Sequence, residues 1–170
     1  MTKLITANKD HVLIIKELAK QLWPDSFASI LSVEQIHYMM NLMYSIPSLE
    51  KQMNEGHKFV IAQNEGQNIG YVSYETNHNA TYKTKIHKLY ISPIYQRKGV
   101  GKKMVDYVAQ KALKSNNTAL FLNVNKNNKT AISFYKKHGF FLVKEEVIDI
   151  GDGFIMDDFV FELSLKEKVY

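Results

Sequence analysis

The chain contains no cysteine among its 170 residues. This absence excludes disulfide bonds, thiolate metal sites and cysteine nucleophiles. Apolar runs are short as well: none approaches the roughly 18 residues needed to cross a bilayer, and residues 1–10 have no apolar core behind a basic start. We therefore expect a cytoplasmic protein. The 6 histidines are scattered without the spacing of metal ligands, so no metal site is predicted.

Low-complexity and linker-like segments are also absent, and the mass of 19.7 kDa suits one ordinary domain. We expect residues 1–170 to form that single domain. The formal net charge of +5 and the pI near 9.2 favour an anionic partner, either nucleic acid or a phosphorylated small molecule. Positive residues concentrate from Lys83 to Lys103, beside glycines. This local cluster favours a bound phosphate.

Alternating apolar residues and turn residues predict a mixed α/β fold whose helices pack on a sheet. The expected strands are residues 3–8, 58–63, 68–76, 83–93, 118–124, 140–150 and 154–163. Asn and Gly in NEGQ predict a hairpin between the second and third strands, and GDG predicts another before the last strand.

Helical spacing of apolar residues predicts a first helix from about Val12 that Pro24 ends. One or two further helices are expected between Val33 and Met53, with a break or a new start at Pro47. Another helix follows residues 96–103, and a short one covers residues 128–137 before Gly139. A strand, helix and strand crossover should therefore connect residues 85 to 124.

Residues 96–103, QRKGVGKK, place four positive charges at the start of a helix, where free amides and the helix dipole favour anions. A Walker A loop does not fit, because Gln96 stands where a glycine is needed and Lys103 where Ser or Thr would bind magnesium. A dinucleotide fingerprint does not fit either, because Met104 replaces its third glycine. The pattern Gln/Arg-x-x-Gly-x-Gly/Ala does fit, and in it successive amides wrap a pyrophosphate.

Gly99 and Gly101 would allow the backbone to approach phosphate oxygens closely. The alternative for this stretch alone is a solvated loop whose glycines shape the helix entry. A second signal lies in residues 128–137, where Asn128 and Tyr135 fall on one helical stripe. A half-buried packed aromatic is the commoner fate of a single tyrosine. An amide paired with a phenol on one stripe is, however, not required by a purely structural helix.

Two stretches together resemble the GNAT family of acetyl-CoA-dependent N-acetyltransferases: KLYISPIYQRKGVGKKMVDYVAQKA and LNVNKNNKTAISFYKKHGF. The first resembles the family's central strand, pyrophosphate loop and helix, and the second its next strand and helix. The resemblance implies a twisted, mixed and mostly antiparallel sheet of about seven strands, flanked by about four helices. It also implies transfer of an acetyl group from acetyl-CoA to a primary amine, by direct attack in a ternary complex.

The resemblance assigns roles to individual residues. The cofactor's pantetheine arm would pair with the strand residues Leu89, Tyr90 and Ile91. The pyrophosphate cradle would consist of Gln96, Arg97, Lys98, Gly99, Val100, Gly101 and Lys102. Asn128 would touch the cofactor arm, and Tyr135 would protonate the departing thiolate. Lys103 would either meet the phosphates with the other cations or face solvent.

The general base stays open. Many members of the family place a glutamate near the start of the central strand, but Lys85 occupies the aligned position here. Glu75 and His87 are the candidates among the side chains, and a chain of waters is a third alternative. An exposed strand-end carboxylate and a packed histidine are the structural alternatives for these two residues.

The acceptor is a separate question. DIGDGFIMDDFVFEL and SLEKQMNEGHKFVIA resemble bacterial polyamine N-acetyltransferases, which act on spermidine and spermine. The carboxylates that could bind a polycation are Asp149, Asp152, Asp157 and Asp158. Aspartate beside glycine is also usual in turns. Other small amines, lysine and protein amino termini are rival acceptors, and the apolar last strand predicts pairing across a homodimer.

A basic module that binds nucleic acid is the non-enzymatic alternative. Its lysines would follow phosphates, and tyrosines such as Tyr82, Tyr90 and Tyr95 would stack on bases. This alternative explains neither the glycines at the helix start nor the amide and phenol on one stripe. We therefore expect a small-molecule amine partner, with no nucleic acid and no membrane.

Overall fold

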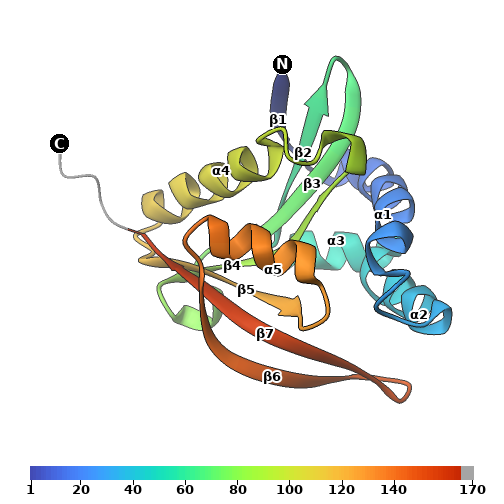
Figure 1. Cartoon of the computed structure of the whole chain (residues 1–170). Coiled ribbons are helices and arrows are strands. Elements are labelled where there is room, and N and C mark those ends of the chain that lie inside the picture. The colour runs from blue at the N-terminus through green and yellow to red at the C-terminus, as the bar shows by residue number, and fades with distance from the viewer. Residues whose placement is uncertain (166–170) are drawn as a thin grey trace. The chain divides into compact units, whose positions relative to one another are not determined.

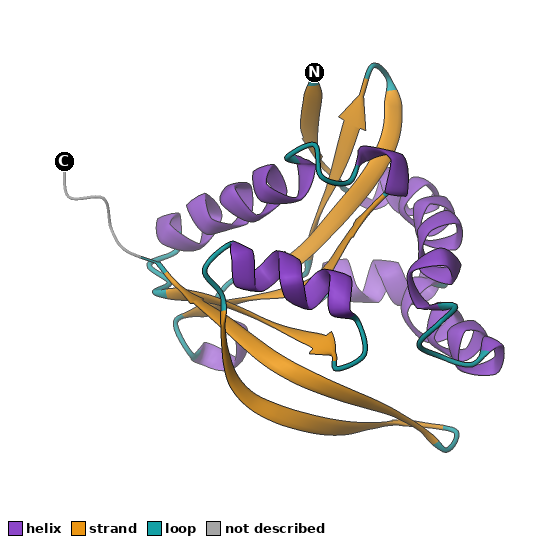
Figure 2. Cartoon of the chain, in the orientation of Figure 1, coloured by secondary structure: helices purple, strands orange, loops and turns teal. Residues whose placement is uncertain are grey.

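A computed structural model describes residues 1–165 (Figure 1), whose strands form one sheet in the order β1-β2-β3-β4-β5-β7-β6. The strands are β1 (Thr2–Thr6), β2 (Lys58–Asn64), β3 (Gln67–Glu75), β4 (Lys83–Ile91), β5 (Ala119–Asn125), β6 (Phe141–Gly151) and β7 (Phe154–Ser164). The α-helices are α1 (Val12–Phe27), α2 (Val33–Tyr44), α3 (Ile46–Asn54), α4 (Val100–Lys114) and α5 (Lys129–Lys137). The expected mixed α/β fold with about seven strands is confirmed (Figure 2). The described residues form five α-helices, one more than the four that were expected.

Two compact units divide the chain. The first unit comprises residues 1–75 and 88–106, and the second comprises residues 76–87 together with the chain from Tyr107 onward. Each unit therefore takes part of β4 and part of α4. The expectation of a single domain over residues 1–170 stays a prediction. Within residues 1–165, no helix is long and apolar enough to span a lipid bilayer.

In the first unit, β2 pairs antiparallel with both β1 and β3, and β2 and β3 form the hairpin that the turn residues predicted. Both strands are buried over successive residues rather than alternate ones, from Phe59 to Ala62 and from Ile69 to Tyr74. Such continuous burial means that both faces of these strands are covered. Helix α1 supplies part of that cover, because it packs against β3 as well as against α2 and α3.

The expectation that Pro24 ends the first helix is wrong, because α1 continues to Phe27. Proline removes one amide donor, but its carbonyl still accepts a hydrogen bond, here from the Ala28 amide at 2.8 Å. On the buried side, the rings of Trp23 and Phe27 lie 4.4 Å apart. Their burial offsets the lost hydrogen bond. The expected new start at Pro47 is confirmed, since Pro47 lies in the first turn of α3 behind the N-cap Ser45.

In the second unit, the first part of β4 runs parallel to β5, with Lys83 opposite Ala119, so the predicted crossover is confirmed. Strands β6 and β7 form the long hairpin of Figure 1, and Asp152 in its turn has a positive φ of 54°. The expectation that the last strand pairs across a dimer stays a prediction. Residues 158–162 of β7 have no open edge, because they pair with β5 on one side and β6 on the other.

Candidate active site

The loop before α4 has the backbone of an anion-binding turn. Arg97 and Gly99 have positive φ angles of 59° and 80°, and both residues are exposed. The first helical hydrogen bond of α4 runs from the Lys103 amide to the Gly99 carbonyl at 3.0 Å. The amides of Val100, Gly101 and Lys102 therefore precede any intrahelical partner. These amides and the positive end of the helix dipole favour a bound anion.

Side chains around the loop fix its ends. Gln96 Nε2 donates a hydrogen bond to the Ile91 carbonyl at 3.2 Å, which joins the loop to the end of β4. Lys103 Nζ donates to the carbonyl of Thr2 in β1. The ammonium of Lys103 is thus engaged by the chain itself. Lys98 is exposed, and its Nζ lies 5.3 Å from the centre of the Tyr95 ring.

The cofactor strand expected at residues 89–91 has a distinct environment. The pairing of β4 with β5 covers Lys83 to Ile86, so residues 89–91 lie beyond that ladder. The Tyr90 ring packs in the first unit, 5.7 Å from Trp23 and 5.6 Å from Tyr71, measured between ring centres. This packing fixes the strand that the resemblance assigns to the pantetheine arm.

Gly70 in β3 allows β3 and β4 to approach closely at this strand. A Cβ at this position would lie 2.5 Å from the Tyr90 carbonyl oxygen and 3.1 Å from Ile91 Cα, which no side chain can occupy. Gly70 was not identified from the sequence. A glycine inside a strand is the only sequence signal of such an approach.

Tyr135 lies in α5 and is buried. Its ring centre is 5.3 Å from that of Phe134 and 5.3 Å from that of Phe140. Burial raises the pKa of the Tyr135 phenol above its ordinary value, so the group keeps its proton at neutral pH. A phenol that stays protonated can serve as a general acid.

Asn128 has a structural role beside the predicted one. It is the N-cap of α5, and its Oδ1 accepts a hydrogen bond from the Ala131 amide at 3.2 Å. The side chain therefore fixes the start of the helix that carries Tyr135. The second unit holds both residues.

The two proposed bases lie in different units. Glu75 ends β3 in the first unit, where its Oε2 is 3.7 Å from His57 Nε2. His57 was not identified from the sequence. His87 lies in β4 in the second unit, with its ring centre 5.6 Å from that of His78. Lys85, which the resemblance aligns with the family's usual glutamate, has its Nζ 5.8 Å from the centre of the Phe121 ring.

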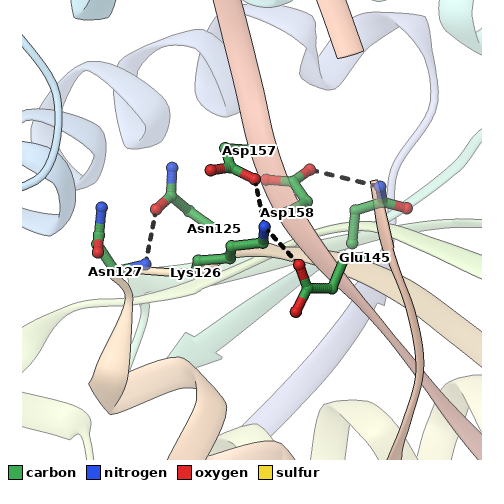
Figure 3. A network of polar contacts seen from close by, with 7 residues as sticks. Asn125, Lys126, Asn127, Glu145, Asp157 and Asp158 are labelled. Atoms are coloured by element: carbon green, nitrogen blue, oxygen red, sulfur yellow. Dashed lines mark hydrogen bonds and ion pairs between the residues drawn. The ribbon is translucent and has the colours of Figure 1, made fainter. Parts of the chain in front are cut away.

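Strands β5, β6 and β7 bring polar side chains together in the second unit. Lys126, which follows β5, forms ion pairs with Asp157 at 2.7 Å and Glu145 at 2.8 Å (Figure 3). These carboxylates raise the pKa of Lys126, because their hydrogen bonds stabilise its charged form. Figure 3 also shows Asp158 beside this group. Asp157 is thus engaged in an ion pair with Lys126, and Asp158 lies beside that pair.

Asn123 of β5 links two further carboxylates. Its Nδ2 donates to Glu146 Oε2 at 2.7 Å and approaches Asp158 Oδ2 at 3.4 Å. Burial raises the pKa of Asp158 to about 6. Hydrogen bonds from Asn123 and Lys144 lower the pKa of Glu146. We name Asn123, Glu146 and Asp158 the carboxylate cluster; of its members, only Asp158 was expected from the sequence to have a role.

The loop at the start of α4 offers an anion-binding site in a chain whose described strands form one seven-stranded sheet. The pattern of the acetyltransferase (GNAT) family matches residues 15–140, and the chain belongs to this family. It is therefore an N-acetyltransferase that uses acetyl-CoA.

Individual relatives agree with this family. The chain is 31% identical over 147 residues to a spermidine N(1)-acetyltransferase of Thermoplasma acidophilum, covering 83% of this chain and 86% of that protein. The crystal structure of PaiA N-acetyltransferase from Thermoplasma acidophilum, in complex with coenzyme A, matches 96% of this chain and 99% of that one with a TM-score of 0.80 at 24% identity. The ribosomal-protein-S18-alanine N-acetyltransferase of Escherichia coli shares the fold with a TM-score of 0.71 at 14% identity, covering 100% of this chain and 99% of that one.

The residues present fit the cofactor. The left-handed turn at Arg97 and Gly99 and the amides at the start of α4 offer donors to a pyrophosphate. The space where a Cβ of Gly99 would stand is open, with no atom within 4 Å. Nothing in the described residues therefore obstructs the approach of phosphate at that point.

Proposed function

We propose that this enzyme acetylates a primary amine of a polyamine such as spermidine or spermine, by direct attack within a ternary complex. The observation that carries the proposal is the 31% identity to a spermidine N(1)-acetyltransferase over most of both chains. A sheet face of the second unit adds support, because its carboxylates offer acceptors to ammonium groups.

Acetyl-CoA supplies the acyl group as a thioester. The cradle of residues 96–102 would bind its pyrophosphate through backbone amides, and Leu89, Tyr90 and Ile91 would hold its pantetheine arm. An amide of this strand would donate to the thioester oxygen as negative charge develops there. Asn128 would contact the arm, and Tyr135 would transfer its phenolic proton to the departing thiolate.

The attacking amine must lose a proton first. Deprotonating an amine of pKa ~10.4 costs about 4.6 kcal/mol at pH 7. Glu75 and His87 are the proposed proton acceptors. Substituting each by glutamine in turn, and comparing kcat at neutral pH, distinguishes between them.

A panel of acceptors tests the substrate. Initial rates with spermidine, a diamine, a lysine-containing peptide and an aminoglycoside are compared at equal acetyl-CoA concentration. We expect spermidine to have the highest kcat/KM, and no turnover of spermidine would end the proposal. A protein amino terminus is the second candidate acceptor, because the alanine N-acetyltransferase named above shares the fold.

We further propose that the enzyme works in the cytoplasm as a homodimer. The edge strand β6 supports association, because Phe141, Leu142 and Val143 are exposed there. An apolar strand with an open edge readily pairs with another chain. Light scattering during gel filtration tests the dimer, and a monomer at micromolar concentration would contradict it.

A further inference from the structure

Four aspartates of the C-terminal hairpin have different environments. Asp149 Oδ1 accepts a hydrogen bond from a backbone amide of the hairpin turn at 2.8 Å, and Asp152 lies in that turn with a positive φ. Asp157 forms an ion pair with Lys126 at 2.7 Å. Turn geometry and the ion pair therefore account for three of the four carboxylates. Asp158 remains.

Asp158 is 1% exposed, and only one of its oxygens has a partner. Its Oδ2 receives the amide of Asn123 at 3.4 Å. Its Oδ1 is buried without a hydrogen bond in the described part of the chain. A buried carboxylate oxygen without a donor is costly and rare in folded proteins. Among the described residues, no donor satisfies this oxygen, so the site can accept one from a bound molecule.

Glu146 lies directly across from Asp158 in the pairing of β6 with β7. Side chains opposite each other in a ladder lie on the same face of the sheet. The amide of Asn123 reaches both carboxylates, Glu146 Oε2 at 2.7 Å and Asp158 Oδ2 at 3.4 Å. Two negative groups are thus fixed on one face by a single neutral amide.

Charged groups on each neighbouring strand act on Asp158. Glu146 on β6 and Asp157 on β7 raise its pKa, the amide of Asn123 on β5 and the charge of Lys85 on β4 lower it, and burial has the largest effect. The pKa of about 6 that results leaves the carboxyl ionised at neutral pH. The cluster is then anionic, and an ammonium ion would relieve the cost of its burial.

We propose that Asp158 and Glu146 bind an ammonium group of the acceptor amine, with the open Oδ1 of Asp158 receiving one of its N–H bonds. An ammonium has three donors and no acceptor, which matches two carboxylates already oriented by an amide. This inference rests on the proposed function, since it names residues that recognise the acceptor.

The test compares spermidine kinetics of Asp158→Asn with those of the wild type. We expect KM for spermidine to rise at least tenfold, because a charged hydrogen bond is lost, while calorimetry gives an unchanged Kd for acetyl-CoA. The increase should persist in 0.5 M NaCl, where diffuse attraction is screened. The control Asp25→Asn removes an exposed carboxylate from α1 and should leave KM unchanged.

A pH series adds a readout that a structural role would not produce. For the wild type, kcat/KM for spermidine should fall as the pH drops below about 6, where Asp158 takes up a proton. Protonation of the amine and of the general base affects both proteins alike, so the ratio of the wild-type value to the Asp158→Asn value should fall over this pH range. If Asp158→Asn does not retain its affinity for acetyl-CoA, Glu146→Gln carries the test, because Glu146 is partly exposed and its loss should also raise KM.

The outcomes separate the two proposals. Wild-type enzyme that does not acetylate spermidine ends the proposed function. Wild-type enzyme that does so, with KM unchanged in both Asp158→Asn and Glu146→Gln, overturns the ammonium site alone.

Discussion

The strands of the two units are buried in opposite ways. In the first unit, β2 and β3 are buried over consecutive residues. In the second unit, β5 alternates between buried and half-buried residues, and β6 is mostly exposed. Strands covered on both faces leave little place for charged side chains, whereas an alternating strand has one face that can carry them.

This difference matches two kinds of chemistry. The first unit offers an anion its backbone amides, at the start of α4 and in the turn at Arg97 and Gly99. The second unit offers side chains: the phenol of Tyr135 and the carboxylates fixed by Asn123. Glycine substitutions should therefore impair the function of the first unit most. Substitutions that change a side chain's chemistry but keep its shape should impair the function of the second unit most.

The largest effect is expected at Tyr135. Tyr135→Phe removes the proposed acid while preserving the packing of the ring against Phe140. We expect kcat to fall by roughly 10²- to 10⁴-fold, as for loss of a placed general acid, with an unchanged Kd for acetyl-CoA. Steady-state rates and calorimetry measure the two quantities. Wild-type turnover in this variant would remove Tyr135 from the mechanism.

Gly99→Ala tests the backbone chemistry of the first unit, with Gly66→Ala as its matched control. Both glycines have φ of +80° and open space around a built Cβ. Each substitution should therefore cost about 1 kcal/mol of stability from strain alone. Only Gly99→Ala should also weaken acetyl-CoA binding, by about tenfold. Calorimetry and thermal unfolding measure these changes, and equal affinity in both variants would contradict the pyrophosphate cradle.

The stability of Asp158→Asn should depend on pH in a defined direction. Burial raises the pKa of Asp158 from 3.8 to about 6, so the folded state favours the protonated carboxyl. Protonation of Asp158 therefore stabilises the folded wild type fully below pH 3.8, and this stabilisation is lost as the pH rises through about 6. Relative to the wild type, the variant should gain about 2 kcal/mol of unfolding free energy between pH 4 and pH 7. Urea unfolding at both pH values measures this, and a constant difference would contradict the raised pKa.

The smallest effects distinguish two lysines near the loop. Lys98→Ala removes an exposed charge beside the proposed phosphate site and should weaken acetyl-CoA binding about threefold at low salt, and less at high salt. Lys103 donates to the Thr2 carbonyl. Lys103→Ala should therefore change that affinity less than about twofold and reduce stability by about 0.5–1 kcal/mol. If Lys103→Ala weakened acetyl-CoA binding more than Lys98→Ala did, Lys103 rather than Lys98 would be the lysine that lies near the phosphates.

The order of strands and helices could be predicted because its signals are local. Apolar periodicity, turn glycines and Pro47 lie within the elements that they specify. The continuation of α1 past Pro24 could not be predicted, because it depends on the packing of Trp23 and Phe27 in the folded core. A proline by itself indicates only the local cost.

The candidate site divides in the same way. The loop at residues 96–103 is contiguous, so its glycines and cations were visible in the sequence. The carboxylate cluster is not contiguous: Asn123 lies 23 residues from Glu146 and 35 from Asp158. Only the register of β5, β6 and β7 brings these residues together. Sequence spacing contains no sign of that register.

One calorimetric titration tests the central claim, that backbone amides of the first unit bind the cofactor and carboxylates of the second unit recognise the amine. Acetyl-CoA is titrated into the wild type, Gly99→Ala and Asp158→Asn under the same conditions. We predict that Gly99→Ala binds about tenfold more weakly than the wild type, and that Asp158→Asn binds equally well. Equal affinity of all three proteins, or a loss confined to Asp158→Asn, would contradict this division.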